Sequence, residues 1–181
     1  MNETITTTAT LAAVPTMHGT FHAVLTERGV RCLLFPDQPG DVDRWLGRHL
    51  RGVTVRAGSD PRGGELASQL DAYFRGERTA FTVPLDLAGT PFQLSVWRQL
   101  QAIPYGEVRS YADVARAIDR PAAVRAVGAA NGANPVPVVV PCHRVIGSSG
   151  ALTGFGGGLD WKRRLLATEN ADRWGELPLL A

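Results

Sequence analysis

This chain of 181 residues has few cysteines and no long apolar segment. Its two cysteines, Cys32 and Cys142, are too few for a disulfide framework, so a reducing compartment is the simplest expectation. No apolar run is long enough to cross a bilayer, and the N-terminus lacks the early positive charge of a secretory signal. With 44% hydrophobic and 20% charged residues, the composition is typical of a globular protein. We therefore expect a cytoplasmic protein that has no membrane partner.

Lysine is almost absent as well. Eighteen of the nineteen basic residues are arginines, and Lys162 is the only lysine. Residues 88–181 carry ten basic and seven acidic side chains, whereas residues 1–87 carry nine and ten. The second half is therefore the better candidate for contact with an anionic partner, although so small an excess is weak support.

The first half of the chain has the pattern of a small α+β unit. His18 and His22 lie four residues apart in an extended segment with no cysteine pair nearby, so we expect no zinc site there. The expected elements are a flexible lead over 1–16, a β-hairpin over 19–35 that turns at Gly29, a helix over 41–49, a strand over 53–56, a helix over 66–74 and a strand over 79–87.

The second half is mostly helical by its pattern. Thr90 and Pro91 are typical of a helix start. Two short helices joined by a tight turn fit a helix-turn-helix, and an αα-hairpin used only for packing is the alternative. We expect domains at 1–88 and 89–181. The expected helices of the second domain cover 91–103, 111–118 with Ser110 as its cap, 120–131 and 160–168.

One cysteine has the setting of a nucleophile. The valine-rich run over 135–140 predicts a short buried strand, which Pro141 ends because proline has no N–H to donate. Cys142 follows directly, beside the ionisable side chains of His143 and Arg144. The thiolate is the reactive form of cysteine, and nearby positive charge favours it. The alternative is a buried cysteine that serves only for packing.

Around this cysteine lies a long set of motifs between about residues 90 and 170. Its residues are Pro91, Phe92, Gln93, Val96 and Trp97; Ile103–Glu107; Ser110 and Tyr111; Arg125–Gly128; Asn134 and Pro135; Pro141–Val145; Leu152–Gly154; Gly157 and Gly158; Lys162; Leu165 and Leu166. In the order and spacing of these residues the sequence resembles the O6-alkylguanine-DNA alkyltransferases, the methylated-DNA–protein-cysteine methyltransferases. That resemblance implies an α+β fold: a small N-terminal α/β domain like ribonuclease H, and a mostly helical C-terminal domain with a winged helix-turn-helix.

The resemblance implies a single-turnover enzyme that removes the alkyl group of O6-alkylguanine in DNA. Cys142 matches the alkyl acceptor, His143 the base that activates it through a bound water, and Glu169 the residue that orients the histidine. Activity toward O4-alkylthymine stays open. The other matched catalytic positions are Asn134, which braces the cysteine loop, Tyr111, which crowds the 3′ phosphate of the flipped nucleotide, and Lys162. Either Lys162 or the Tyr111 hydroxyl is expected to stabilise guanine N3 as the base leaves.

The implied partner is double-stranded DNA that carries O6-alkylguanine, bound by a monomer through the minor groove with the target base flipped out. Arg125 matches the arginine that fills the gap in the base stack, and Ala126 beside it is small enough for a narrow groove. Val145 and Gly156 match backbone contacts to the base. Phe155 replaces the tyrosine of many family members, so one hydroxyl is missing from the pocket. The chemistry requires no metal and no cofactor.

Three other function classes compete with this interpretation. A non-catalytic protein that binds alkylated DNA is the main alternative, and the presence of Cys142 counts against it. A thiol hydrolase would need an oxyanion hole, for which the sequence offers no obvious residues. A transcription factor would need a second DNA-contact surface or a dimerisation helix, and neither is visible.

Overall fold

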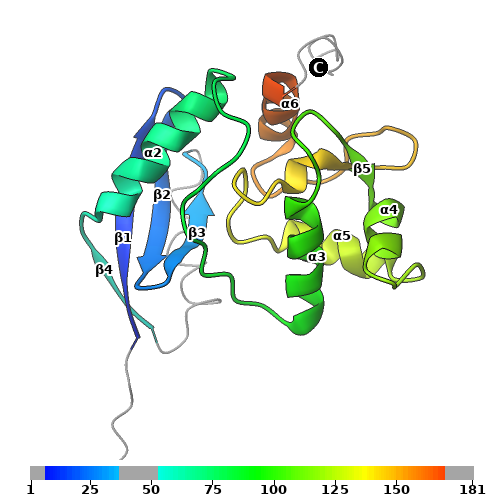
Figure 1. Ribbon diagram of the computed structural model, residues 1–181, viewed down its shortest axis with the longest axis horizontal. Helices are drawn as coiled ribbons and strands as arrows, with labels where there is room; N and C mark the ends of the chain where they lie inside the picture. Colours follow the sequence, from blue (N-terminus) through cyan, green and yellow to red (C-terminus); the bar gives the residue numbers. More distant parts are fainter. Residues whose placement is uncertain (1–6, 37–52, 170–181) are drawn as a thin grey trace, which may run out of the picture. The chain divides into compact units, whose positions relative to one another are not determined.

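The computed structural model describes residues 7–36 and 53–169, which belong to two compact units (Figure 1). The first unit comprises residues 1–72 and 81–87, and the second comprises 73–80 and 88–181. The helix expected over 41–49 lies outside the described residues. None of the described helices is both long enough and apolar enough to cross a membrane.

The first unit is built on a four-stranded sheet with the order β3-β2-β1-β4. β2 pairs antiparallel with both β1 and β3, while β4 runs parallel to β1. Helix α2 lies across one face of this sheet (Figure 1). The expected hairpin at Gly29 and the strand near residue 53 are both confirmed. The elements are β1 (Thr7–Thr16), β2 (Gly19–Thr26), β3 (Gly29–Leu34), β4 (Val53–Ala57) and α2 (Pro61–Phe74).

The lead expected over 1–16 is instead a strand from Thr7 onward. β1 bonds to two strands at once, with Thr10 opposite Leu25 of β2 and opposite Arg56 of β4. Its small and β-branched side chains suit this central position, because such residues pack well on a pleated surface. The expectation was wrong because the pairing partners are supplied by distant parts of the chain.

The strand expected over 79–87 is not formed either. Only Leu85 makes an isolated bridge, to Val30 of β3. Pro84 has no N–H for a sheet ladder, and its carbonyl accepts from the Val30 N–H at 2.9 Å. The segment runs so close to the hairpin that a Cβ on Gly29 would lie 2.3 Å from the Pro84 oxygen. Gly29 also has a φ of +145°, so the turn needs glycine for two reasons.

The second unit is mostly helical. Capping boxes at Thr90 and Ser110 start α3 and α4, as the sequence predicted. The buried indole of Trp97 in α3 donates from Nε1 to the carbonyl of Ala130 in α5 at 2.8 Å, which ties these helices together. The elements are α3 (Pro91–Gln101), β5 (Arg109–Ser110), α4 (Tyr111–Ala117), α5 (Val124–Gly132), the 3₁₀ turn η1 (Cys142–Arg144), β6 (Val145–Ile146) and α6 (Leu159–Glu169).

Two expectations for this unit need correction. The helix expected over 120–131 begins at Val124, because Asp119 has a φ of +57° and the next residues form a turn. The run over 135–140 is buried as expected, but it folds into a tight turn in place of a strand. The Val140 N–H donates to the Val136 carbonyl at 2.9 Å. Pro135 and Pro137 have no N–H to donate, and Val138 has a φ of +73°, which an extended strand does not allow.

Candidate active site

Cys142 opens the 3₁₀ turn η1 at the end of this valine turn, with only 4% of its surface exposed. Its N–H donates to the Val140 carbonyl at 2.8 Å, and its carbonyl accepts from Asn131 Nδ2 at 3.4 Å. Burial raises the pKa of the Cys142 thiol to about 11, although Asn134 and Lys162 act in the opposite direction. The thiol is therefore protonated at neutral pH and needs a base.

Asn134 braces the turn that carries the cysteine. Its Nδ2 donates to the Val140 carbonyl at 2.8 Å, and its Oδ1 accepts from the Val136 N–H at 3.1 Å. The same Val140 carbonyl accepts from the N–H of Cys142, so the amide side chain and the nucleophile share one backbone acceptor. This arrangement agrees with the bracing role that the resemblance implies.

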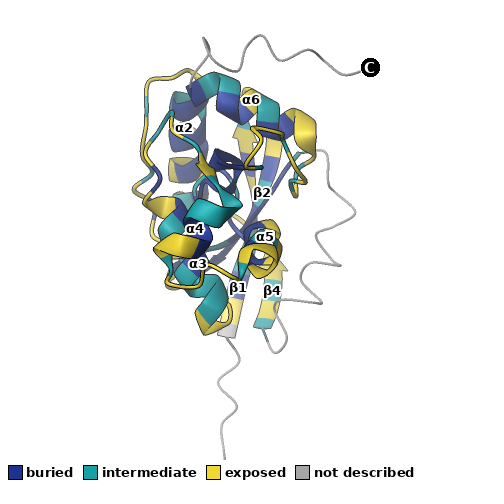
Figure 2. Ribbon diagram, turned by 90° about the vertical axis from the view of Figure 1, so that its right-hand side faces the viewer, coloured by how far each residue is buried: buried dark blue, intermediate teal, exposed yellow. Residues whose placement is uncertain are grey.

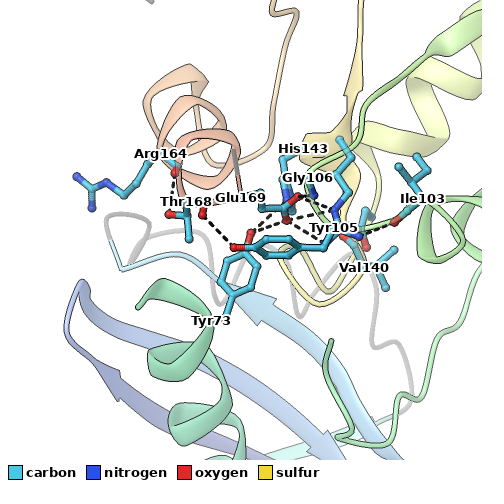
Figure 3. A network of polar contacts seen from close by, with 11 residues as sticks. Tyr73, Ile103, Tyr105, Gly106, Val140, His143, Arg164, Thr168 and Glu169 are labelled. Carbon is cyan, nitrogen blue, oxygen red and sulfur yellow. Dashed lines mark hydrogen bonds and ion pairs between the residues drawn. The ribbon is translucent and has the colours of Figure 1, made fainter. Parts of the chain in front are cut away.

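His143 is fully buried and meets the carboxylate of Glu169 (Figure 3). Its Nε2 lies 2.7 Å from Glu169 Oε1. Its other ring nitrogen, Nδ1, is buried and has no hydrogen-bond partner among residues 7–36 and 53–169. Burial lowers the pKa of His143 even though Glu169 acts to raise it, so the imidazole is neutral at pH 7. A neutral histidine with one nitrogen bonded to a carboxylate keeps the other as a base.

Glu169 is the centre of a dense set of donors at the end of α6. Arg144 donates to it from Nε at 2.9 Å and from Nη2 at 2.9 Å, and the Gly106 N–H donates at 3.1 Å. The Tyr73 hydroxyl donates to Oε1 at 2.7 Å. Burial alone would raise the pKa of Glu169, but the hydrogen bonds from His143 and Arg144 outweigh it and lower the pKa to about 2. The carboxylate is therefore ionised at neutral pH.

The sequence predicted that the side chains next to Cys142, His143 and Arg144, would supply the positive charge that favours its thiolate. In the structure these two side chains do not supply it. His143 is neutral, and the Arg144 guanidinium is bound to Glu169 and to the Ile103 carbonyl. The cation that acts on the thiol is Lys162, whose charge lowers the Cys142 pKa. Burial has the larger effect on the Cys142 pKa, because loss of hydration destabilises the thiolate by more than one nearby cation stabilises it.

Lys162 is fully buried and bridges two backbone carbonyls. Nζ donates to Val145 at 2.7 Å and to Thr153 at 3.1 Å. Burial lowers the pKa of Lys162 to about 8, and the charge of Cys142 acts against that shift. Thr153 also donates from Oγ1 to the Tyr111 hydroxyl at 3.1 Å. Lys162 thus bonds to the backbone of Val145 and Thr153, and Thr153 in turn bonds to Tyr111. These contacts connect the three predicted residues Lys162, Val145 and Tyr111.

The remaining predicted residues lie nearer the surface. Arg125 and Ala126 are exposed on α5, whose opposite face is buried (Figure 2). Phe155 is half-buried and Gly156 is exposed in the glycine-rich loop before α6. Six residues separate Arg125 from Asn131, or roughly 9 Å along a helix, so α5 connects an exposed arginine to the carbonyl of Cys142.

Two members of the site were not identified from the sequence. Tyr73 was covered only by the helix expected over 66–74, and no local signal marks its hydroxyl. Arg144 was noted for its charge, but its pairing with Glu169 was not foreseen. A buried arginine requires a carboxylate partner, so its position in an apolar segment was a usable signal. Among the described residues, no three His, Cys, Asp or Glu side chains group as a metal site would need.

Both halves of the chain match models of one protein family. Residues 15–87 match the ribonuclease-like domain of 6-O-methylguanine DNA methyltransferase, and residues 91–171 match its DNA binding domain. The methylated-DNA–protein-cysteine methyltransferase of Mycolicibacterium paratuberculosis is 64% identical over 101 residues. That alignment covers 56% of this chain and 61% of that protein, which is less than two thirds of its length.

Solved structures extend the similarity to nearly the whole chain. The crystal structure of Mycobacterium tuberculosis O6-methylguanine methyltransferase has a TM-score of 0.75 and 40% identity, and the match covers 94% of this chain and 96% of that one. Mycobacterium tuberculosis OGT in complex with DNA also has a TM-score of 0.75, with 42% identity over 90% of this chain and 93% of that one. The predicted two-domain fold of mixed α and β content is confirmed, and the chain belongs to the 6-O-methylguanine DNA methyltransferase family.

Proposed function

We propose that this protein repairs O6-alkylated guanine in double-stranded DNA by transferring the alkyl group to Sγ of Cys142. The observation that carries the proposal is the relay beside this cysteine. Nδ1 of His143 is buried with no hydrogen-bond partner among the described residues, and Glu169 Oε1 lies 2.7 Å from the opposite nitrogen, Nε2. This is the order of nucleophile, base and orienting acid that activates a weak nucleophile.

Activation of the thiol is the first step. With a pKa of about 11, only about one Cys142 thiol in ten thousand is ionised at pH 7. His143 Nδ1 accepts the proton through one intervening water molecule, as the family resemblance implies. Glu169 then stabilises the imidazolium that forms, because its low pKa keeps it negatively charged. Lys162 favours the thiolate by its positive charge.

Transfer follows by in-line displacement at the alkyl carbon. The bond from Sγ to carbon forms while the bond from carbon to guanine O6 breaks, and the electron pair stays on the departing base. The proton lost by the thiol is balanced by one gained by guanine. Tyr111 and Lys162 are the proposed donors that stabilise the base as it leaves. The thioether has no easy leaving group, so each protein molecule acts once.

Contact with DNA is assigned to α5. Its outer face offers the exposed Arg125 beside the small Ala126, which suits a helix that enters a narrow minor groove. Flipping the base costs a few kcal/mol, which an arginine inserted in its place offsets. Affinity should be modest, tolerant of sequence and weakened by salt, because phosphates supply most of it. A monomer acting in the cytoplasm is part of the same proposal.

The test is the intact-protein mass after mixing with one equivalent of duplex that contains a single O6-methylguanine. The wild type should gain one methyl group in place of one proton, and the Cys142→Ala variant should gain nothing. Cys32→Ala is the matched control, because Cys32 is buried in the sheet of the first unit and should not react. A wild type that binds the lesion without a change in mass would move the protein to the class of non-catalytic binders of alkylated DNA.

A further inference from the structure

The hydroxyl of Tyr73 occupies a place in the active site that the family resemblance does not assign. Tyr73 is the penultimate residue of α2, is fully buried and belongs to the second compact unit. Its Oη lies 2.7 Å from Glu169 Oε1 and 3.3 Å from His143 Nε2 (Figure 3). The hydroxyl thus touches the orienting acid and the base at the point where they meet.

The protons in this cluster have only one consistent arrangement. Burial and the negative charge of Glu169 raise the pKa of Tyr73 well above its ordinary value, so the hydroxyl keeps its proton and donates it. Glu169 is ionised and can only accept. The proton on His143 must therefore lie on Nε2, directed at Glu169 Oε1 with the Tyr73 oxygen beside it. Nδ1 remains as the basic nitrogen.

We infer that Tyr73 is a positioning residue for alkyl transfer, which fixes the Glu169 carboxylate and through it the tautomer and basicity of His143. The inference rests on the proposed function and deepens it. Tyr73 lies in the segment that matches the ribonuclease-like domain, and it belongs to the same compact unit as His143 and Glu169.

The physical effect of the hydroxyl is to share one oxygen of the carboxylate. Oε1 of Glu169 accepts hydrogen bonds from both Tyr73 and His143. Because the two donors share the negative charge of one oxygen, each weakens the interaction of that oxygen with the other donor. Without the hydroxyl, more of that charge acts on the imidazole and raises the pKa of His143. The titratable groups around this cluster are Glu169 and Lys162 from α6, Arg144 and Cys142 from η1, Tyr73 from α2, and Tyr105.

The experiment compares Tyr73→Phe with Tyr105→Phe in the full chain. The Tyr105 ring lies 6.0 Å from that of Tyr73, but its hydroxyl donates to the Thr168 carbonyl at 2.9 Å and does not bond to Glu169. Single-turnover rates of methyl transfer from the O6-methylguanine duplex are measured from pH 5 to pH 9. We expect Tyr73→Phe to move the acid limb of the profile up by about half a pH unit, and Tyr105→Phe to leave it in place.

Each outcome decides one point. An acid limb that is unmoved in Tyr73→Phe, or moved equally in both variants, overturns the inference even if the rate falls, because a purely structural defect lowers the plateau alone. If Tyr73→Phe does not fold, nitrogen NMR of His143 in the wild type decides: protonated Nε2 with bare Nδ1 supports the inference, and the opposite tautomer overturns it. A wild type that transfers no methyl group to Cys142 at any pH refutes the proposed function itself.

Discussion

Replacing Glu169 by glutamine should destabilise the fold in a way that depends on pH. The carboxylate is 1% exposed and accepts hydrogen bonds from Arg144, His143, Tyr73 and the Gly106 N–H. A pKa that falls from 4.5 to about 2 on folding corresponds to about 3 kcal/mol of stability. Because the folded chain binds this proton more weakly, the stabilisation is complete above pH 4.5 and is lost as the pH falls toward 2. Glu169→Gln should therefore cost about 3 kcal/mol at pH 7.

The assay is urea unfolding of wild type and Glu169→Gln at pH 7 and at pH 3. The gap between the two free energies of unfolding should shrink by about 2 kcal/mol between these pH values, since the wild type loses most of its advantage. Glu107→Gln is the matched control, because this carboxylate is half exposed and pairs with Arg109 at the surface. A gap that stays constant with pH would refute the assignment of Glu169 as the buried anion of the site.

Three further predictions concern DNA, the pocket and the fold. Arg125→Ala should slow repair of duplex about tenfold or more while leaving attack on the free modified base unchanged; Arg120→Ala, also exposed, is the control, and equal losses on both substrates would rule out a role in flipping. Phe155→Tyr should change the rate of alkyl transfer but not the affinity for duplex in a binding titration, and identical rates would dismiss a role for the missing hydroxyl. Gly29→Ala should lower the free energy of unfolding by about 2 kcal/mol or more, because the added Cβ meets a backbone carbonyl at 2.3 Å. Gly64→Ala, in open space on α2, should raise stability by about 0.5–1 kcal/mol, and a similar loss in both variants would contradict the steric argument.

Local chemistry explains why several elements could be predicted. Thr90 with Gln93, and Ser110 with Asp113, satisfy the N–H groups at the start of a helix with side chains a few residues away. The positive φ of Gly29 is likewise a local requirement of its turn, although its close approach to Pro84 is not. Predictions failed where a segment needed a distant partner or lacked donors of its own. Thr7–Thr16 became a strand through pairing on both edges. The valine-rich run before Cys142 did not, because Pro135 and Pro137 lack N–H groups and Val138 has a positive φ.

The sequence by itself determined the family and the position of the candidate nucleophile, because the motifs around Cys142 and their spacing are specific. Through the family resemblance it also indicated Cys142, His143 and Glu169 as a candidate relay. Only the tertiary structure decided what surrounds the relay. Tyr73 and Glu169 are 96 residues apart, Gly106 and Glu169 are 63 apart, and Arg144 and Glu169 are 25 apart. No local pattern encodes such contacts, since a hydrogen bond requires atoms within about 3 Å and folding alone brings them there. Burial, which reverses the expected ionisation of Cys142, is likewise a property of the folded chain.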